Sequence, residues 1–168
     1  FQLIVNFANL VQCIPDLKNK QQLWLHISLE RALIALKSAE SKNKDQLFRF
    51  AVFSASLCLF LGKVMTEFQV VSCDQNGSCS YDVCLLSNFI SDRGGFYRMR
   101  PLFSAPKSLQ QSLTLLLAYK VMPNVSAAWL AGDLSLLANW ISALTWSDSD
   151  IGELNSICEL SEEQIYCR

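Results

Sequence analysis

A chain of 168 residues is long enough to bury one full hydrophobic core and fits a single domain. Hydrophobic residues make up 51% of it and charged residues only 17%, and the formal net charge of −1 excludes a strong overall attraction to nucleic acid. We expect one domain over residues 1–168. The start without methionine suggests that this domain is an excerpt of a longer chain.

The first third of the sequence predicts three helices. The first covers 1–13 and ends near Pro15, because a proline disfavours helix in the residue before it. The second covers 21–41 and repeats its apolar residues at spacings of three and four. The third, over 46–63, is apolar on nearly every face, which is typical of the centre of a bundle. Its uncharged stretch, 50–62, is shorter than the roughly 20 residues of a membrane span, so we expect a buried core helix.

The middle of the sequence changes to a β pattern. Segments 68–73 and 79–83 flank Asn76-Gly77, a pair that favours the positive φ angles of a tight type I′ turn, so a β-hairpin is predicted. A short helix, a glycine loop and a strand-like segment should follow, at 83–90, Gly94-Gly95 and 96–100.

The last third returns to a helical pattern. Helical segments are predicted at 109–122, 125–130, 134–144 and 150–166. Gly132-Asp133 offers a helix start, and Asp150 with Glu153 forms a capping-box pattern. Four tryptophans lie in helical patterns and are predicted to pack in the core: Trp24, Trp129, Trp140 and Trp146. Together the elements predict a mainly α fold with one small β-hairpin.

The seven cysteines show no clear disulfide framework. Three of them sit in apolar patterns typical of small buried thiols: Cys13, Cys58 and Cys158. No secretory signal is recognisable, so we expect reduced thiols and a cytoplasmic location. Cys73, Cys79 and Cys84 have a C-x5-C-x4-C spacing, unlike the close pairs of structural zinc sites, which favours ordinary hairpin cysteines over a zinc knuckle. Cys73 and Cys79 face each other across the turn, which leaves oxidation in air as an alternative.

A single histidine, His26, removes much of the enzyme repertoire. A His-Glu-x-x-His zinc site needs two histidines. A Ser-His-Asp or Cys-His relay would have to use His26, and no nucleophile elbow lies near it in the sequence. We therefore interpret His26 as a partly buried helix histidine that makes one or two hydrogen bonds.

Basic residues between 86 and 120 outnumber the single acid there, Asp92, whereas the tail from Ser147 is acidic. An aromatic pair followed by arginines is able to stack on bases and contact phosphates. The candidate nucleic-acid contacts are Arg93, Tyr97, Arg98 and Arg100. The alternative is an edge strand with one packed face and one wet face.

Six segments carry a resemblance to a known family. Three lie in the first half: Leu10-Val-Gln-Cys-Ile-Pro15, Leu23-Trp-Leu-His-Ile-Ser-Leu-Glu-Arg-Ala-Leu33 and Leu57-Cys-Leu-Phe-Leu-Gly-Lys63. The others are the hairpin, Phe96-Tyr-Arg-Met-Arg100 and the leucine-rich stretch 115–130 with its proline and Trp-Leu pair. Their order and local pattern resemble the HD-type domain of the TraI-like relaxases of the MobH group, found in plasmids and integrating conjugative elements. The resemblance covers most of the chain and implies an HD-like helical bundle.

The departures from the family pattern concern its metal site. The resemblance implies a His-Asp pair that binds metal and activates water for phosphodiester cleavage, and this chain has Leu59 and Phe60 at those positions. The residual family-motif positions are His26 and Glu159, the latter standing where the family has an Ala-Asp pair. The further histidine expected before the leucine-rich helix is missing from 107–112. One histidine and one glutamate cannot hold a dinuclear site.

We therefore expect a non-catalytic HD-like domain of a conjugative-transfer or mobile-element protein, without metal or cofactor, serving DNA handling or protein assembly. Its expected partners are DNA, through a weak basic surface, and conjugation proteins or flanking domains, with no membrane contact. One alternative is a metal-dependent phosphodiesterase or nuclease with an altered site, built from His26, Glu159 and a hairpin cysteine. The other is an unrelated helical interaction domain.

Overall fold

The described part of the chain folds into helices with one small sheet, so the prediction of a mainly α fold is confirmed. The structure, a computed structural model, describes residues 1–12, 14–15, 22–89, 96–102, 105–146 and 152–166. The helices are α1 (Gln2–Val11), α2 (Trp24–Ser41), α3 (Gln46–Cys58), α4 (Lys63–Glu67), α5 (Lys107–Val121), α6 (Asn124–Ala131), α7 (Leu134–Thr145) and α8 (Glu153–Tyr166). The strands are β1 (Phe68–Cys73), β2 (Cys79–Asp82) and β3 (Phe96–Pro101). Cys13, Arg93, Gly94-Gly95 and Asp150 lie outside the described residues.

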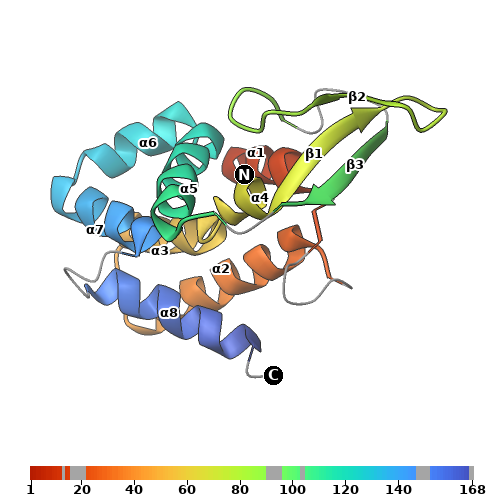
Figure 1. The fold of residues 1–168 in the computed structure, drawn as a ribbon. Coiled ribbons are helices and arrows are strands. Elements are labelled where there is room, and N and C mark those ends of the chain that lie inside the picture. Colours follow the sequence, from red (N-terminus) through yellow and green to blue (C-terminus); the bar gives the residue numbers. More distant parts are fainter. Residues whose placement is uncertain (13, 16–21, 90–95, 103–104, 147–151, 167–168) are drawn as a thin grey trace.

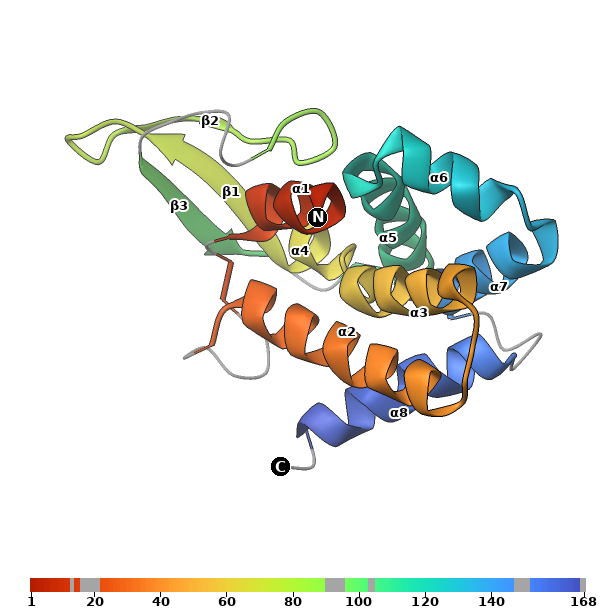
Figure 2. The same cartoon turned by 180° about the vertical axis from the view of Figure 1, so that it is seen from behind.

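Helix α3 is the centre of the helical bundle. It contacts α2, α5, α6, α7 and α8, while the sheet lies to one side and joins the bundle through α4 and β1 (Figure 1). The view from behind shows α2 and α8 together on the side of α3 away from α5 and α6 (Figure 2). The acceptor at the start of α3 is Asp45, whose carboxylate takes a hydrogen bond of 2.7 Å from Phe48 N.

The predicted buried core helix is confirmed in α3. Ala51, Val52, Ala55 and Leu57 are fully buried, and the small alanines let neighbouring helices approach closely. The segment Gln46–Glu67, which contains α3 and α4, is long and apolar enough by composition to cross a membrane, with a mean hydropathy of 1.7 in its most apolar window. Of that window, 61% is buried inside the structure, as in the core helix of a soluble protein.

The single helix predicted over 46–63 is confirmed over 46–58 and wrong over 59–62, where the chain breaks between α3 and α4. Phe60 has a positive φ of 63° and so leaves the helical conformation. Gly62 then passes so close to α5 that a Cβ atom there would overlap Gln110 O and lie 2.7 Å from Thr114 N. Gly62 N donates a 2.9 Å hydrogen bond to Thr114 Oγ1. The break therefore depends on contacts with α5, whose Thr114 lies 52 residues after Gly62 in the chain.

The sheet has three strands in the order β2-β1-β3, all antiparallel, which is one strand more than the predicted hairpin. Val70 of β1 pairs with Met99 of β3 on the face that packs against the core. Val71 and Arg98 form the next pair and belong to the opposite face. The strand at 96–101 is therefore the edge strand with one packed face that the sequence offered as an alternative.

The hairpin turn and its cysteines differ from expectation. Only Gly77 has a positive φ there, 81°, so the two-residue type I′ turn does not form. The Asp74 carboxylate accepts hydrogen bonds from Asn76 N and Ser78 N, at 2.9 and 2.8 Å, and this Asx turn widens the loop. Cys73 and Cys79 form a disulfide where β1 and β2 meet, which corrects the expectation of reduced thiols at these two positions.

The short helix predicted over 83–90 is wrong in its described part, 83–89, which contains a turn and no helix. The ammonium of Lys120 on α5 donates to the carbonyl oxygens of Leu85 and Asn88, at 2.6 and 2.7 Å. These bonds keep the backbone of 83–89 non-helical, because two of its carbonyl oxygens accept from the Lys120 side chain rather than from the N–H groups of a following helical turn.

The C-terminal helices follow the prediction, with one correction for the tryptophans. Asp133 accepts a 2.9 Å hydrogen bond from Leu136 N and so caps α7 at the predicted start. Trp24 and Trp140 are buried, as predicted. Trp129 and Trp146 are not buried, and their exposed fractions are 46% and 40%. Trp129 lies on the outer side of the short helix α6, and Trp146 is the C-cap residue of α7.

Candidate functional site

A cavity of about 350 Å³ opens beside the break between α3 and α4. One wall is apolar and consists of Leu59, Phe60, Ala143 and Trp146. One side of α8 also lines the cavity and contributes Asn155, Cys158 and three carboxylates, Glu159, Glu162 and Glu163. Lys107 and Ser142 complete the lining. The cavity therefore combines an aromatic surface with an acidic one.

The aromatic wall is a pair of rings held by two unusual backbone conformations. The rings of Phe60 and Trp146 meet edge to face, with centroids 4.0 Å apart and planes at 83°. Phe60 follows the C-cap of α3 and Trp146 is the C-cap of α7, and their φ angles are 63° and 49°. Glycine usually occupies such positions, because a side chain in the left-handed region costs roughly 1–2 kcal/mol. Two helix ends accept this strain at the place where their side chains line the cavity.

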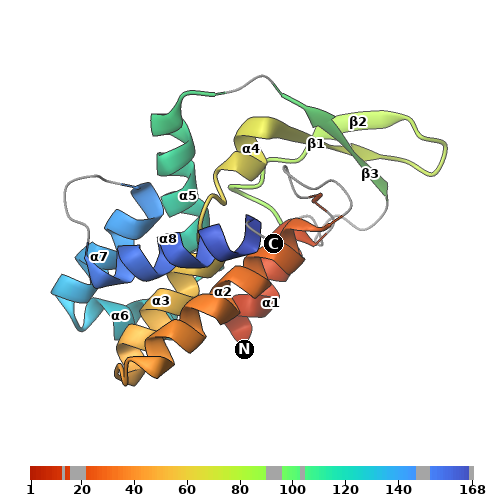
Figure 3. The ribbon, with the colours of Figure 1, turned by 90° about the horizontal axis from the view of Figure 1, so that it is seen from below.

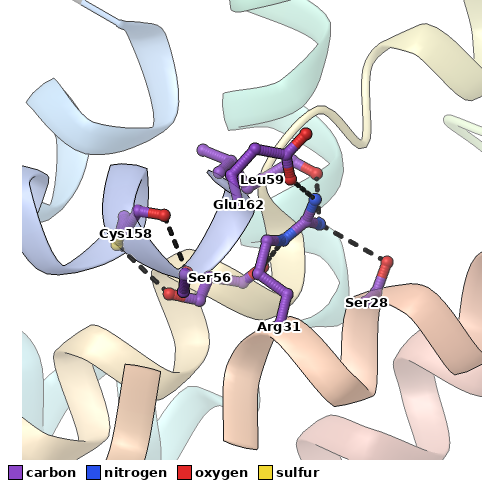
Figure 4. A network of polar contacts seen from close by, with 7 residues as sticks. Ser28, Arg31, Ser56, Leu59, Cys158 and Glu162 are labelled. Atoms are coloured by element: carbon purple, nitrogen blue, oxygen red, sulfur yellow. Dashed lines mark hydrogen bonds and ion pairs between the residues drawn. The ribbon is translucent and has the colours of Figure 1, made fainter. Parts of the chain in front are cut away.

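Arg31 lies beneath this cavity and joins three helices, as Figure 4 shows. Its side chain is 2% exposed. Nε donates to Ser56 O at 2.8 Å and Nη2 to Leu59 O at 3.0 Å, so the guanidinium satisfies carbonyls at the end of α3 that have no partner within the helix. Nη1 forms a 2.8 Å ion pair with Glu162 of α8. The pairing is possible because α8 lies alongside α2 (Figure 3).

The two buried thiols near this network are unreactive groups at neutral pH. Burial raises the pKa of Cys58 to about 12 and that of Cys158 to about 11. Cys158 is 3.2 Å from Ser56 Oγ, a contact drawn in Figure 4. Both thiols stay protonated at pH 7, so neither serves as a nucleophile. Cys84 differs, because it is exposed and hydrogen bonds from the backbone of Leu86 and from Ser87 lower its pKa.

The structure brings some of the predicted site residues together and separates others. Leu59, Phe60 and Glu159, three positions that the resemblance connects with a metal site, line one cavity. His26 does not line it and is exposed on α2, which corrects the expectation of a partly buried histidine. Arg31 follows five residues later, about 140° further round the helix, and faces the interior instead.

The proposed single-metal site is not assembled. Within the ranges that the structure describes, no three His, Cys, Asp or Glu side chains come close enough to hold a metal ion. His26, Glu159 and a hairpin cysteine therefore do not form one ligand set. The disulfide between Cys73 and Cys79 also removes two of the three thiols from the zinc-knuckle alternative.

The candidate nucleic-acid contacts are divided between two faces of β3. Arg98 and Arg100 are exposed on the outer face. Tyr97 and Met99 pack against the core from the other face, so Tyr97 cannot stack on a base bound at the arginines. Arg93 lies outside the described residues.

Several residues in or beside the site were not predicted from the sequence as site residues, among them Arg31, Lys107, Trp146, Glu162 and Glu163. A signal for Arg31 exists in the buried face of α2, where Trp24, Ile27, Ser28, Arg31 and Ala35 repeat at spacings of three and four. The predicted apolar pattern identified only part of this face: Leu25 and Leu29 pack against the core, whereas Leu33 is 51% exposed. No local pattern marks Trp146 or Glu162, because their role depends on how α7 and α8 pack.

Comparisons with known proteins assign no family to the chain. The sequence matches no model of a known protein family. It also matches no curated protein at the significance required. What this chain does is therefore inferred from its own residues.

Proposed function

We propose that this chain is a non-catalytic, HD-like helical domain of a conjugative-transfer or mobile-element protein that serves DNA handling or protein assembly. The observation that carries the non-catalytic part is the position of Arg31 beneath Leu59 and Phe60. The order of the helices and the hairpin along the chain is compatible with the resemblance on which the HD-like part depends.

The side chains at the presumed metal position supply no ligand. Leu59 and Phe60 are hydrocarbons at their ends, and the guanidinium of Arg31 lies 5.4 Å from the Phe60 ring centroid. Glu162 is the carboxylate that reaches this place, and it is already paired with Arg31. The guanidinium of Arg31 therefore occupies the position beside Glu162 that a metal ion would need. Its positive charge would repel a metal cation there.

The DNA-handling part is supported by the outer face of β3. Arg98 and Arg100 are two residues apart on one strand, so their side chains leave the same face about 7 Å apart. Both are exposed, and Arg100 stands next to the uncharged Gln69 in the register of the sheet. The proposal keeps the expected cytoplasmic location, and the burial of most of the apolar segment in the bundle supports a position away from the membrane.

Charge reversal of the two arginines tests DNA handling. Fluorescence anisotropy with a labelled DNA duplex, at several salt concentrations, should show weak binding by the unmodified chain. In Arg98→Glu/Arg100→Glu the affinity should fall at least about tenfold. The negative slope of log K against log salt should become shallower by about 2, because two phosphate contacts are lost. Binding that is unchanged in the double variant would exclude this face and leave protein assembly as the role.

Lys37 provides the matched control. It is exposed on α2, so Lys37→Glu changes the net charge as much as either single arginine reversal does. We expect Lys37→Glu to weaken binding less than Arg98→Glu alone. Equal losses would mean that only the overall charge of the chain matters, and the arginine face would have no special part.

A further inference from the structure

A second, smaller cavity lies where α4 meets α5, beside the pair of rings formed by Phe60 and Trp146. Its volume is about 40 Å³, and about 10–15 Å³ is enough for one water molecule, so it has room for a charged group of a few atoms. The polar part of its lining includes Lys63 of α4 and Lys107, Gln110 and Gln111 of α5. No carboxylate stands among the described residues that line it, in contrast to the larger cavity along α8.

Two ammonium groups lie over this one pair of rings. Lys63 Nζ is 4.6 Å from the Phe60 ring centroid, and Lys107 Nζ is 5.8 Å from the Trp146 ring centroid. The two positive charges repel each other, and the negative face of an aromatic ring compensates for this only weakly where solvent has access. Neither lysine forms an ion pair with a residue that the structure describes. The cavity therefore holds two positive charges that an anion between them would stabilise.

The backbone fixes both lysines at the cavity. Lys63 N donates to Phe60 O at 2.8 Å. The preceding Gly62 N donates to Thr114 Oγ1, which ties the start of α4 to α5. Lys107 is the first residue of α5, whose first turn has no acidic residue and whose N-cap residue offers no side-chain acceptor. Because a helix dipole disfavours a lysine at this end and favours negative charge, an anion beside Lys107 would be stabilised there as well.

Two amide side chains add uncharged donors to the lysines. Gln110 and Gln111 lie in the first two turns of α5, and both are half-buried. Neither side chain forms a hydrogen bond with a residue in the described ranges. An amide donates two hydrogen bonds, and a lysine ammonium donates three and accepts none, so this set of donors suits an anionic oxygen. The adjacent Phe60 and Trp146 rings offer a flat apolar surface for the rest of a ligand.

We propose that this cavity binds the carboxylate of a small organic acid. The carboxylate lies between Lys63 and Lys107, and the apolar stem runs along Phe60 and Trp146 into the larger cavity, which shares Lys107 and both rings. A carboxylate is planar and fits a small space beside flat rings, whereas a phosphate group is larger and has three acceptor oxygens. The site binds its ligand without a reaction, and it stands independently of the proposed role in DNA handling or assembly.

Calorimetric titration of the full chain with phenylacetate tests the ligand class. This acid should bind, and more weakly as salt is added, because solvent ions screen the lysines. Phenylacetamide has a similar shape without the charge and 2-phenylethylamine has the opposite charge, so neither should bind. Absence of phenylacetate binding up to about 10 mM overturns the proposal. Tighter binding of phenyl phosphate than of phenylacetate overturns the carboxylate assignment in favour of a phosphate group.

Variants that remove charge and keep side-chain length test the two lysines. Lys63→Gln/Lys107→Gln should weaken phenylacetate binding at least about tenfold. Glu159→Gln/Glu163→Gln should strengthen it, because negative charge is removed from the adjoining larger cavity, and this opposite sign separates an anion site from a cation site. Lys37→Gln removes an exposed positive charge elsewhere on α2 and should change nothing. Undiminished binding in the double lysine variant overturns the assignment.

Trp146→Gly tests the place of the apolar stem without depending on folding. Glycine suits the positive φ of Trp146, so the unfolding midpoint should change little. Phenylacetate binding should fall to the level of acetate, which has the same charged group and no ring. Asn43→Gly makes the same backbone exchange at another exposed, positive-φ position and should leave binding unchanged. Full phenylacetate affinity in Trp146→Gly would overturn the placement of the stem on the rings.

The arginine variants separate this site from DNA handling. Arg98 and Arg100 do not line the cavity, so Arg98→Glu/Arg100→Glu should bind phenylacetate as the unmodified chain does, whether or not its DNA binding changes. A parallel loss of phenylacetate binding in this variant would mean that the acid responds only to the overall charge of the chain, and it would overturn the site at Lys63 and Lys107.

Discussion

The guanidinium of Arg31 contacts α2, α3 and α8 at once. Five donors in a planar fork allow it to bond Ser56 O and Leu59 O while it pairs with Glu162. A lysine has a single ammonium and could not reach these acceptors from one position. The residue therefore supports both the end of α3 and the wall of the cavity.

Removing this guanidinium should destabilise the chain strongly. Arg31→Met removes the ion pair between Arg31 and Glu162, whose side chain is 18% exposed, and takes a donor from two buried carbonyl oxygens. We expect the free energy of unfolding, measured with a chemical denaturant, to fall by about 3–5 kcal/mol, the range for breaking a buried pair. Adding Glu162→Gln should recover part of the loss, because the carboxylate that lost its arginine is then neutral.

An exposed ion pair provides the comparison for this variant. Lys44, in the link between α2 and α3, pairs with Glu153 of α8, and the exposed fractions of the two side chains are 31% and 41%. Lys44→Met should change stability little, because solvent screens such a pair. If Arg31→Met proved as mild as Lys44→Met, the buried network would not be what holds α2, α3 and α8 together.

At the scale of elements, the link between α3 and α4 decides the shape of the site. It turns at Phe60, and Gly62 passes directly over the backbone of α5. The link places Leu59 and Phe60 at the cavity and lets α4 continue into β1. A continuous helix over 46–63 would have carried Phe60 elsewhere on its surface.

Gly62→Ala tests this close approach. The added Cβ would overlap Gln110 O, and backbone atoms cannot move aside as a flexible side chain can. We expect a loss of about 1–3 kcal/mol in the free energy of unfolding, as in other overpacked sites. Gly152→Ala is the control, because its nearest neighbour is Asn139 Oδ1 at 3.5 Å, an ordinary contact. Equal stability of the two variants would contradict the tight packing of the link.

The helices were predictable because periodicity and capping are local properties. The start of α7 at Asp133 needed only its own carboxylate and the next residues. The break at Phe60 was not predictable, because it depends on Arg31 from α2 and on α5. The strand β3 was clear in pattern, but its place beside β1 is a long-range pairing that no local pattern specifies.

At the scale of the whole molecule, the packing of α2 and α8 on α3 explains why the site was only partly predictable. Phe60 and Glu159 were identified through motif order, and both line the cavity. His26 was identified in the same way and faces solvent, because the buried face of α2 is that of Arg31 and its small neighbours. Motif order specifies which helix a residue belongs to, whereas only packing specifies the direction in which it points.

The central claim is that Arg31 and Glu162, with Leu59 and Phe60, leave no place for a catalytic metal. The metal content of the purified chain tests this claim most directly, by elemental mass spectrometry after dialysis without a chelator. We predict less than about a tenth of an equivalent of manganese, iron, nickel or zinc per chain, since metal binding needs a set of deprotonated ligands. A stoichiometric amount of any of these metals would contradict this claim and would favour the alternative of a metal-dependent phosphodiesterase.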